Sequence, residues 1–200
     1  MIVEMFTLLH EITTPATCDL LETFGKGGVH ISLKYTSERP PLSLRRAVTL
    51  ALLRQVLVRK FHWSLEDSLT VTLDHHSSGA PYLNFSKAIF IEKISISISH
   101  TGNWVGVAVL RSENPIGFDI EMFSRKRSVI PISKHIFFRT EQDYVNTHGK
   151  LGFYFLWGAK EALAKLHKQG LSFALGLELG AQLLPPGPDI QSSVLLDGKS

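Results

Sequence analysis

The stretch ISISISHTGNWVGVAVLRSENPIGFDIEM, Ile94 to Met122, decides the predicted fold. Isoleucines alternate with serines in its first part, a period of two that is typical of a half-buried strand. Thr101-Gly102-Asn103 is a predicted hairpin turn, and the unbroken apolar run Trp104–Leu110 is a second strand. After a turn over Ser112–Pro115, a third strand covers Ile116–Met122. The stretch therefore predicts a three-stranded meander.

A helix is predicted on each side of this meander. Upstream, Ser43 is a candidate N-cap after two prolines, and residues 44–60 read as a helix rich in Leu, Val and Ala. Downstream, residues 152–168 read as a second helix, and Gly170 is the candidate cap at its end. Its predicted core stripe consists of apolar residues three and four positions apart, namely Leu156, Ala159, Leu163 and Leu166.

Composition bounds the class of protein. A further short strand is predicted over residues 69–73, and strands and helices follow without a regular βαβ alternation, so the predicted class is α+β. Of the 200 residues 44% are hydrophobic and 20% are charged, which excludes a disordered chain. No apolar run approaches the roughly 18–20 residues that a membrane span needs. Cys18 is the single cysteine, which excludes an intramolecular disulfide, and with no basic leader at the N-terminus it predicts a cytoplasmic protein.

The charges nearly cancel, because 21 Lys and Arg minus 18 Asp and Glu leave +3, but they are unevenly placed. Seven basic residues lie between Lys34 and Lys60 against one acid, and five lie between Met122 and Arg139 against none. Such stretches indicate a polyanionic partner, either a phosphorylated small molecule, a nucleic acid or an acidic protein, and the plain alternative is a solvated charged face. Because no aromatics are interleaved and no nucleic-acid motif is present, nucleic acid is the least favoured partner.

Two pairs of residues are candidates for chemistry. Asp119 and Glu121 alternate on a predicted strand, so both carboxylates project from one face, where their repulsion calls for a cation or a bound proton. Oxygen ligands favour a hard ion, Mg²⁺ above all when phosphates complete its shell. Glu161 and Lys165 lie four apart on a helix, almost opposite the apolar stripe. The alternatives are an exposed acidic face and a surface salt bridge worth about 0.3–0.5 kcal/mol.

His100 is a third candidate, at the tip of the predicted hairpin. If both turns of the meander are tight, residue 121 pairs near residue 105, which pairs near residue 99. Ser99 and His100 then lie at the same end as Glu121, a suitable place for a group that contacts an anion. The motifs of α/β-hydrolases, P-loop proteins, Rossmann dinucleotide-binding proteins and zincins are absent, and one cysteine cannot build a thiolate zinc site.

Three blocks follow one another along the chain: ISHTGNW over 98–104, PIGFDIE over 115–121 and LWGAKEALAK over 156–165. Each is weak alone, but together and in this order they closely resemble the 4′-phosphopantetheinyl transferases, in particular the longer, Sfp-type branch. The motifs of that branch are I-S-H-S/T-G, I-G-I/F-D-I-E and W-x-x-K-E-x-x-x-K. Weaker similarity extends over about residues 40–175.

The resemblance implies a fold of two similar α+β halves related by a pseudo-twofold, here near residues 1–112 and 113–200, with the active site between them. It implies transfer of the 4′-phosphopantetheine arm of coenzyme A to a serine of an apo acyl or peptidyl carrier protein, with release of 3′,5′-ADP. The carrier would belong to fatty-acid, polyketide or nonribosomal-peptide synthesis. The implied protein is a monomer without nucleic-acid or membrane partners.

The resemblance also implies the roles of individual residues. Asp119, Glu121 and Glu161 would hold Mg²⁺ together with the diphosphate of coenzyme A. Glu161 would in addition take the proton of the serine, directly or through water. Lys165 would neutralise charge on the attacked phosphate and on the leaving group, and His100 completes the catalytic set.

The implied coenzyme A contacts are Ser99 and His100, which would touch its phosphates, Lys165, and Arg46, which would face the nucleotide. One departure concerns Ala80, in the segment Gly79-Ala80-Pro81-Tyr82, because many relatives have lysine there. A charge expected to contact coenzyme A is therefore missing. This departure keeps an alternative open, a non-catalytic module that binds coenzyme A or a carrier and retains the fold.

Overall fold

The computed structural model describes residues 2–8, 20–24, 28–85, 93–123 and 126–179. Cys18 lies outside the described residues. Within them, no helix combines the length and the apolar character that a membrane crossing requires. The elements are both helices and strands, which confirms the predicted α+β class, whereas the pseudo-twofold and the two halves stay predictions.

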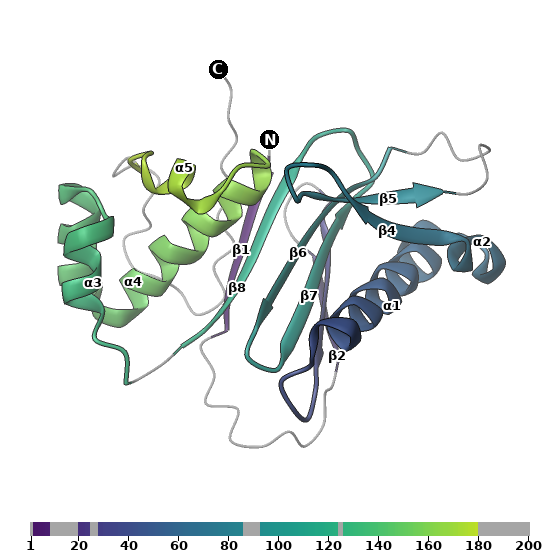
Figure 1. Ribbon diagram of the computed structural model, residues 1–200, viewed down its shortest axis with the longest axis horizontal. Coiled ribbons are helices and arrows are strands. Elements are labelled where there is room, and N and C mark those ends of the chain that lie inside the picture. The colour runs from purple at the N-terminus through teal and green to yellow at the C-terminus, as the bar shows by residue number, and fades with distance from the viewer. Residues whose placement is uncertain (1, 9–19, 25–27, 86–92, 124–125, 180–200) are drawn as a thin grey trace.

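A four-stranded antiparallel sheet occupies the middle of the molecule (Figure 1). Its order is β2-β3-β7-β6, with bounds Leu20–Phe24, His30–Tyr35, Trp104–Leu110 and Ser95–Thr101. The predicted hairpin is confirmed as β6 and β7, and the chain reverses at Gly102, whose φ of +53° suits a residue without a side chain. Val105 pairs with His100, one residue from the predicted partner.

The third predicted strand, β8 (Ile116–Met122), has the predicted bounds but a different partner. It pairs in parallel with β1 (Ile2–Leu8), so that Glu121 lies opposite Thr7 instead of residue 105. The predicted meander is therefore wrong at this strand, because both edges of β7 are already hydrogen-bonded, to β3 and to β6. β1 thus pairs with a strand more than 100 residues further along the chain, and the strand pairing crosses the boundary expected near residue 112.

The first half of the chain packs α1 (Leu42–Phe61) against the four-stranded sheet. Leu53, Val56 and Leu57 of α1 are buried in a core shared with Val107. α1 begins after Pro41, whose extended backbone makes it the N-cap, so the prediction of Ser43 for that position is wrong.

A short helix, α2 (Leu65–Leu69), follows α1 and was not predicted. Ser64 caps it by accepting a hydrogen bond from the Asp67 N–H at 3.0 Å, and the helix includes Leu69, where a strand was expected. The strand begins later, as β4 (Val71–His75), which pairs with β5 (Pro81–Phe85) in a second hairpin.

In the second half, α4 (Arg139–Leu166) packs against β8, and α3 (Val129–Ile136) and α5 (Leu171–Leu175) pack against α4 (Figure 1). α4 begins earlier than predicted, and its backbone breaks at Gly149. The predicted core stripe of α4 is confirmed, because all of its members are buried: Leu156, Ala159, Leu163 and Leu166. A side chain at Gly117 of β8 would lie 2.0 Å from the Ala162 carbonyl oxygen, so only glycine lets β8 approach α4 this closely.

α4 ends before the predicted position. The Gln169 N–H donates to the Ala164 carbonyl and the Lys168 N–H to the Lys165 carbonyl, a Schellman motif with Lys168 at the position that usually belongs to glycine. The φ of Lys168 is +54°, which costs an L-residue roughly 1–2 kcal/mol. Gly170 is the N-cap of α5, so its prediction as the cap of α4 is wrong.

A buried ion pair fixes the C-terminal packing. Lys160 Nζ lies 2.8 Å from Glu141 Oε1, and both side chains are fully buried. Lys160 also donates to the Leu177 carbonyl, and Glu141 accepts from the Leu179 N–H at 2.8 Å. The pair therefore ties the two ends of α4 to the segment that follows α5.

We expect Lys160→Met to lower the free energy of unfolding by about 3–5 kcal/mol, because it leaves the carboxylate of Glu141 buried without its counter-charge. Lys160→Met combined with Glu141→Gln should recover part of this loss, since glutamine is neutral and still accepts the Leu179 hydrogen bond. Urea unfolding of the three proteins measures both effects. Equal losses in the single and the double variant would contradict the prediction.

Candidate active site

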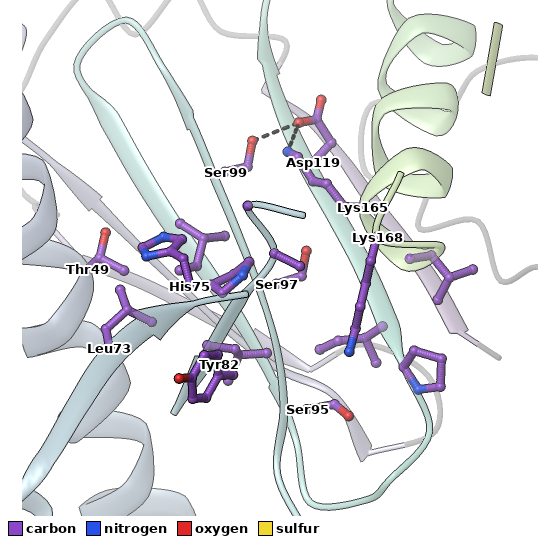
Figure 2. A pocket seen from close by; sticks show the side chains of 18 of the residues that line it. Thr49, Leu73, His75, Tyr82, Ser95, Ser97, Ser99, Asp119, Lys165 and Lys168 are labelled. Carbon is purple, nitrogen blue, oxygen red and sulfur yellow. Dashed lines mark hydrogen bonds and ion pairs between the residues drawn. The ribbon is translucent and has the colours of Figure 1, made fainter. Parts of the chain in front are cut away.

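A cavity of about 660 Å³ lies among α1, the β4–β5 hairpin, β6, β8 and α4 (Figure 2). These elements come from both halves of the chain, and the cavity is where they face one another. The structure brings every residue of the predicted site to its wall: Arg46, Ser99, His100, Asp119, Glu121, Glu161 and Lys165.

Asp119 is the centre of the site and is 3% exposed. Its Oδ1 accepts a hydrogen bond of 2.7 Å from the Ser99 hydroxyl of β6 and one of 2.6 Å from Lys165 Nζ of α4, as Figure 2 shows. Its Oδ2 is buried and has no hydrogen-bond partner among the described residues. One carboxylate thus joins β6, β8 and α4 and keeps one oxygen available.

Lys165 lies on the face of α4 opposite the apolar stripe, as predicted, but that face is turned to the cavity. Its Nζ donates to Asp119 and, at 3.2 Å, to the Phe118 carbonyl, so it is directed at β8. The surface salt bridge within the helix that the sequence left open as an alternative is therefore not the contact that Lys165 makes.

Glu121 and Glu161 complete a cluster of three carboxylates. Burial, followed by the charges of Asp119 and Glu161, raises the pKa of Glu121 to about 7, against a hydrogen bond from Trp157 that lowers it. Burial and then the charge of Asp119 also raise the pKa of Glu161, while Lys165 lowers it. The charges among these causes indicate that the three carboxylates lie close enough to repel one another.

His100 is held by a residue that sequence reasoning missed. The Arg45 guanidinium lies 2.9 Å from His100 Nε2, so it donates to a neutral imidazole that accepts at this nitrogen. Partial burial and then the charges of Arg45 and Lys165 hold the pKa of His100 below its usual value, although a hydrogen bond to its own backbone raises it. The signal for Arg45 was the adjacent pair Arg45-Arg46 at the start of α1, of which only Arg46 was singled out; both side chains line the cavity.

Lys168 is a second missed residue of the cavity wall. Figure 2 shows its side chain running away from Asp119 and Lys165, in the direction of Ser95. No sequence signal pointed to it, because its place at the end of α4 depends on the left-handed backbone of a residue that is not glycine. Ala80 lies in the same wall and contributes no charge.

The donors at the cavity suit a divalent cation by their chemistry. Three carboxylates that repel one another, one of them with a buried oxygen that lacks a partner, are oxygen ligands of the kind that Mg²⁺ prefers. In the part of the chain that the structure describes, however, no three His, Cys, Asp or Glu side chains are arranged to hold a metal ion. The Lys165 ammonium is the cation that lies against Asp119 in this arrangement.

Comparison with known proteins supports the resemblance. The model of the 4′-phosphopantetheinyl transferase superfamily matches residues 115–197, which include the second and third sequence blocks. A curated 4′-phosphopantetheinyl transferase from Bacillus subtilis is 36% identical over 101 residues, which cover 48% of this chain and 41% of that relative. Over these residues the chain is similar to the 4′-phosphopantetheinyl transferase superfamily, as the sequence blocks predicted. The Sfp-type branch stays a prediction, and the chain spans about two fifths of the length of the curated relative.

We expect Glu121→Gln to stabilise the protein at high pH when no divalent cation is present. The pKa of Glu121 is about 7 in the folded chain against 4.5 in the unfolded one, so the wild type loses stability as the pH rises from 4.5 to 7. Glutamine carries no proton to lose, so the difference in Tm between variant and wild type should grow over this window and stay constant above it.

Thermal unfolding between pH 4.5 and pH 8 in EDTA measures this difference. Glu38→Gln is the matched control, because Glu38 is exposed and does not line the cavity. A Tm difference for Glu121→Gln that is the same at both ends of the window would show that the pKa of Glu121 is not raised in the folded protein.

Proposed function

We propose that the protein transfers the 4′-phosphopantetheine group of coenzyme A to a serine hydroxyl of an apo acyl or peptidyl carrier protein and releases 3′,5′-ADP. The observation that carries the proposal is the meeting of Asp119, Glu121, Glu161 and Lys165, from β8 and α4, at one cavity. Phosphoryl transfer requires positioned charge more than covalent help from the protein, and this cavity supplies positioned charge of both signs.

The carboxylates of Asp119, Glu121 and Glu161 would hold Mg²⁺, which would offset the negative charge of the diphosphate of coenzyme A. Glu161 would accept the proton of the carrier serine, a role that its raised pKa supports because a stronger base accepts a proton more readily. Lys165 would neutralise the charge that develops on the leaving diphosphate oxygen. Its ammonium already lies at the centre of the site, 2.6 Å from Asp119.

Two sets of basic residues would serve different partners. Four cations line the cavity and would meet the phosphates of coenzyme A: Arg45, Arg46, Lys165 and Lys168. Four exposed cations around α3 lie outside the cavity wall: Lys126, Arg127, Lys134 and Arg139. This second set suits the acidic surface of a carrier protein, since surface charge guides association without entering the site.

Ala80 favours a second candidate, a module that binds coenzyme A or a carrier without catalysis. The residue lies in the cavity wall where a cation was expected, so one contact to a phosphate is missing. Lys168 is a cation in the same wall. Catalysis is therefore the first candidate.

Transfer is tested by incubating the protein with coenzyme A, Mg²⁺ and apo carrier proteins from fatty-acid, polyketide and nonribosomal-peptide synthesis. Mass spectrometry should show the addition of one phosphopantetheine group to a carrier and its loss when EDTA replaces Mg²⁺. Asp119→Asn, Glu161→Gln and Lys165→Met should each lower the rate at least ~10²-fold, since each removes charge that acts on the transferred group.

Glu38→Gln is the control for these variants and should keep the wild-type rate, because Glu38 is exposed and lies outside the cavity wall. Circular dichroism checks that each variant is folded. Binding of coenzyme A without transfer to any carrier would favour the second candidate, and full activity of Asp119→Asn or Glu161→Gln would disprove the assigned roles.

A further inference from the structure

The junction between β6 and β8 is made by side chains instead of by the main chain. The N–H groups of Phe118 and Ile120 donate to the hydroxyls of Ser97 at 3.0 Å and Ser99 at 3.3 Å. The Met122 N–H donates to the Thr101 hydroxyl at 3.3 Å. The residues of each pair are 21 positions apart, so the two strands run parallel in one constant register.

We call Ser97, Ser99 and Thr101 the hydroxyl ladder. In an ordinary parallel pair these N–H groups would donate to carbonyls of the neighbouring strand. Here the hydroxyls accept in their place, and so they satisfy main-chain groups at a buried junction, where an N–H without a partner is costly. The alternating serines of β6, which the sequence showed only as the polar face of a half-buried strand, join the four-stranded sheet to the pair of β1 and β8.

Ser99 makes one contact that the other members of the ladder do not make. Its hydroxyl accepts from the Ile120 N–H and donates its single proton to Asp119 Oδ1 at 2.7 Å. The side chain is 5% exposed. Because a serine hydroxyl has one proton to donate, Ser99 in this arrangement has none for a phosphate of coenzyme A, the contact that the resemblance implies.

We propose that Ser99 is a positioning residue that acts through Asp119. The Ile120 hydrogen bond fixes the Ser99 hydroxyl to the backbone of β8, and that hydroxyl, with Lys165 on the same oxygen, fixes the rotation of the Asp119 carboxylate. Oδ2 is thereby kept as the oxygen without a partner, available to a divalent cation. The use of this oxygen in catalysis rests on the proposed function, whereas the orientation of the carboxylate does not.

Three variants separate positioning from a general structural role. Ser99→Ala removes the hydrogen bonds to both Ile120 and Asp119, whereas the matched control Ser97→Ala removes only the bond to Phe118. Ser99→Thr keeps the hydroxyl and should rescue the loss. Amide hydrogen exchange checks the ladder itself: in Ser99→Ala the Ile120 amide should exchange faster while the Phe118 amide keeps its protection.

The first functional readout is Mn²⁺ binding in the presence of coenzyme A, followed by electron paramagnetic resonance. Ser99→Ala should weaken Mn²⁺ binding by about tenfold or more, the usual effect of removing a group that orients a metal ligand. Ser97→Ala should weaken it several-fold less, and Ser99→Thr should bind within a few-fold of the wild type. The Mg²⁺ concentration that gives half-maximal transfer should rise in the same order.

The second readout is the affinity for coenzyme A in EDTA, measured by calorimetry. Positioning through Asp119 predicts equal affinities for Ser99→Ala and the wild type without a divalent cation, whereas a direct phosphate contact predicts weaker binding by Ser99→Ala. Equal effects of Ser97→Ala and Ser99→Ala on Mn²⁺ binding, or a loss of affinity in EDTA, would overturn the proposal. If the wild type modifies no carrier, the proposed function fails, while hydrogen exchange and Mn²⁺ binding still decide the role of Ser99.

Discussion

The buried carboxylate of Asp119 is the constraint on which the site depends. A charge removed from water destabilises the fold by several kcal/mol unless it is paired and hydrogen-bonded. Ser99 of β6 and Lys165 of α4 meet that requirement at one oxygen, so β6, β8 and α4 must come together at this point. Gly117 makes the approach of β8 to α4 sterically feasible. The same packing that satisfies Asp119 brings Glu161 of α4 to the cavity.

Two lysines of α4 differ in burial and therefore in what they do. Lys160 and Lys165 belong to one sequence block, but five residues turn a helix by roughly 140° beyond a full turn, so the two side chains leave α4 on different sides. Lys160 is fully buried against Glu141 and holds the C-terminal packing, whereas Lys165 faces the cavity. Two lysines of one motif thus have separate tasks, one in stability and one at the site.

The sequence correctly predicted elements whose residues are decided by local patterns. The hairpin of β6 and β7 follows from alternation and a glycine turn, and the buried stripe of α4 follows from helical spacing. It failed for β8, whose partner is β1 from the start of the chain, because no local pattern records that both edges of β7 are filled. The prediction that Ser99 lies at the same end as Glu121 is nevertheless confirmed, because β6 and β8 run parallel and Ser99 lies beside Ile120.

The sequence by itself determined the resemblance to the 4′-phosphopantetheinyl transferases, the α+β class and the set of residues that would meet, because three ordered blocks and the spacing of their carboxylates are local information. Only the tertiary structure decided which groups touch: that Lys165 pairs with Asp119 and not with Glu161, that Ser99 joins β8, and that Arg45 and Lys168 line the cavity. The physical reason is that buried polar and charged groups require hydrogen-bond partners, and only the packed chain shows which side chains lie near enough to provide them.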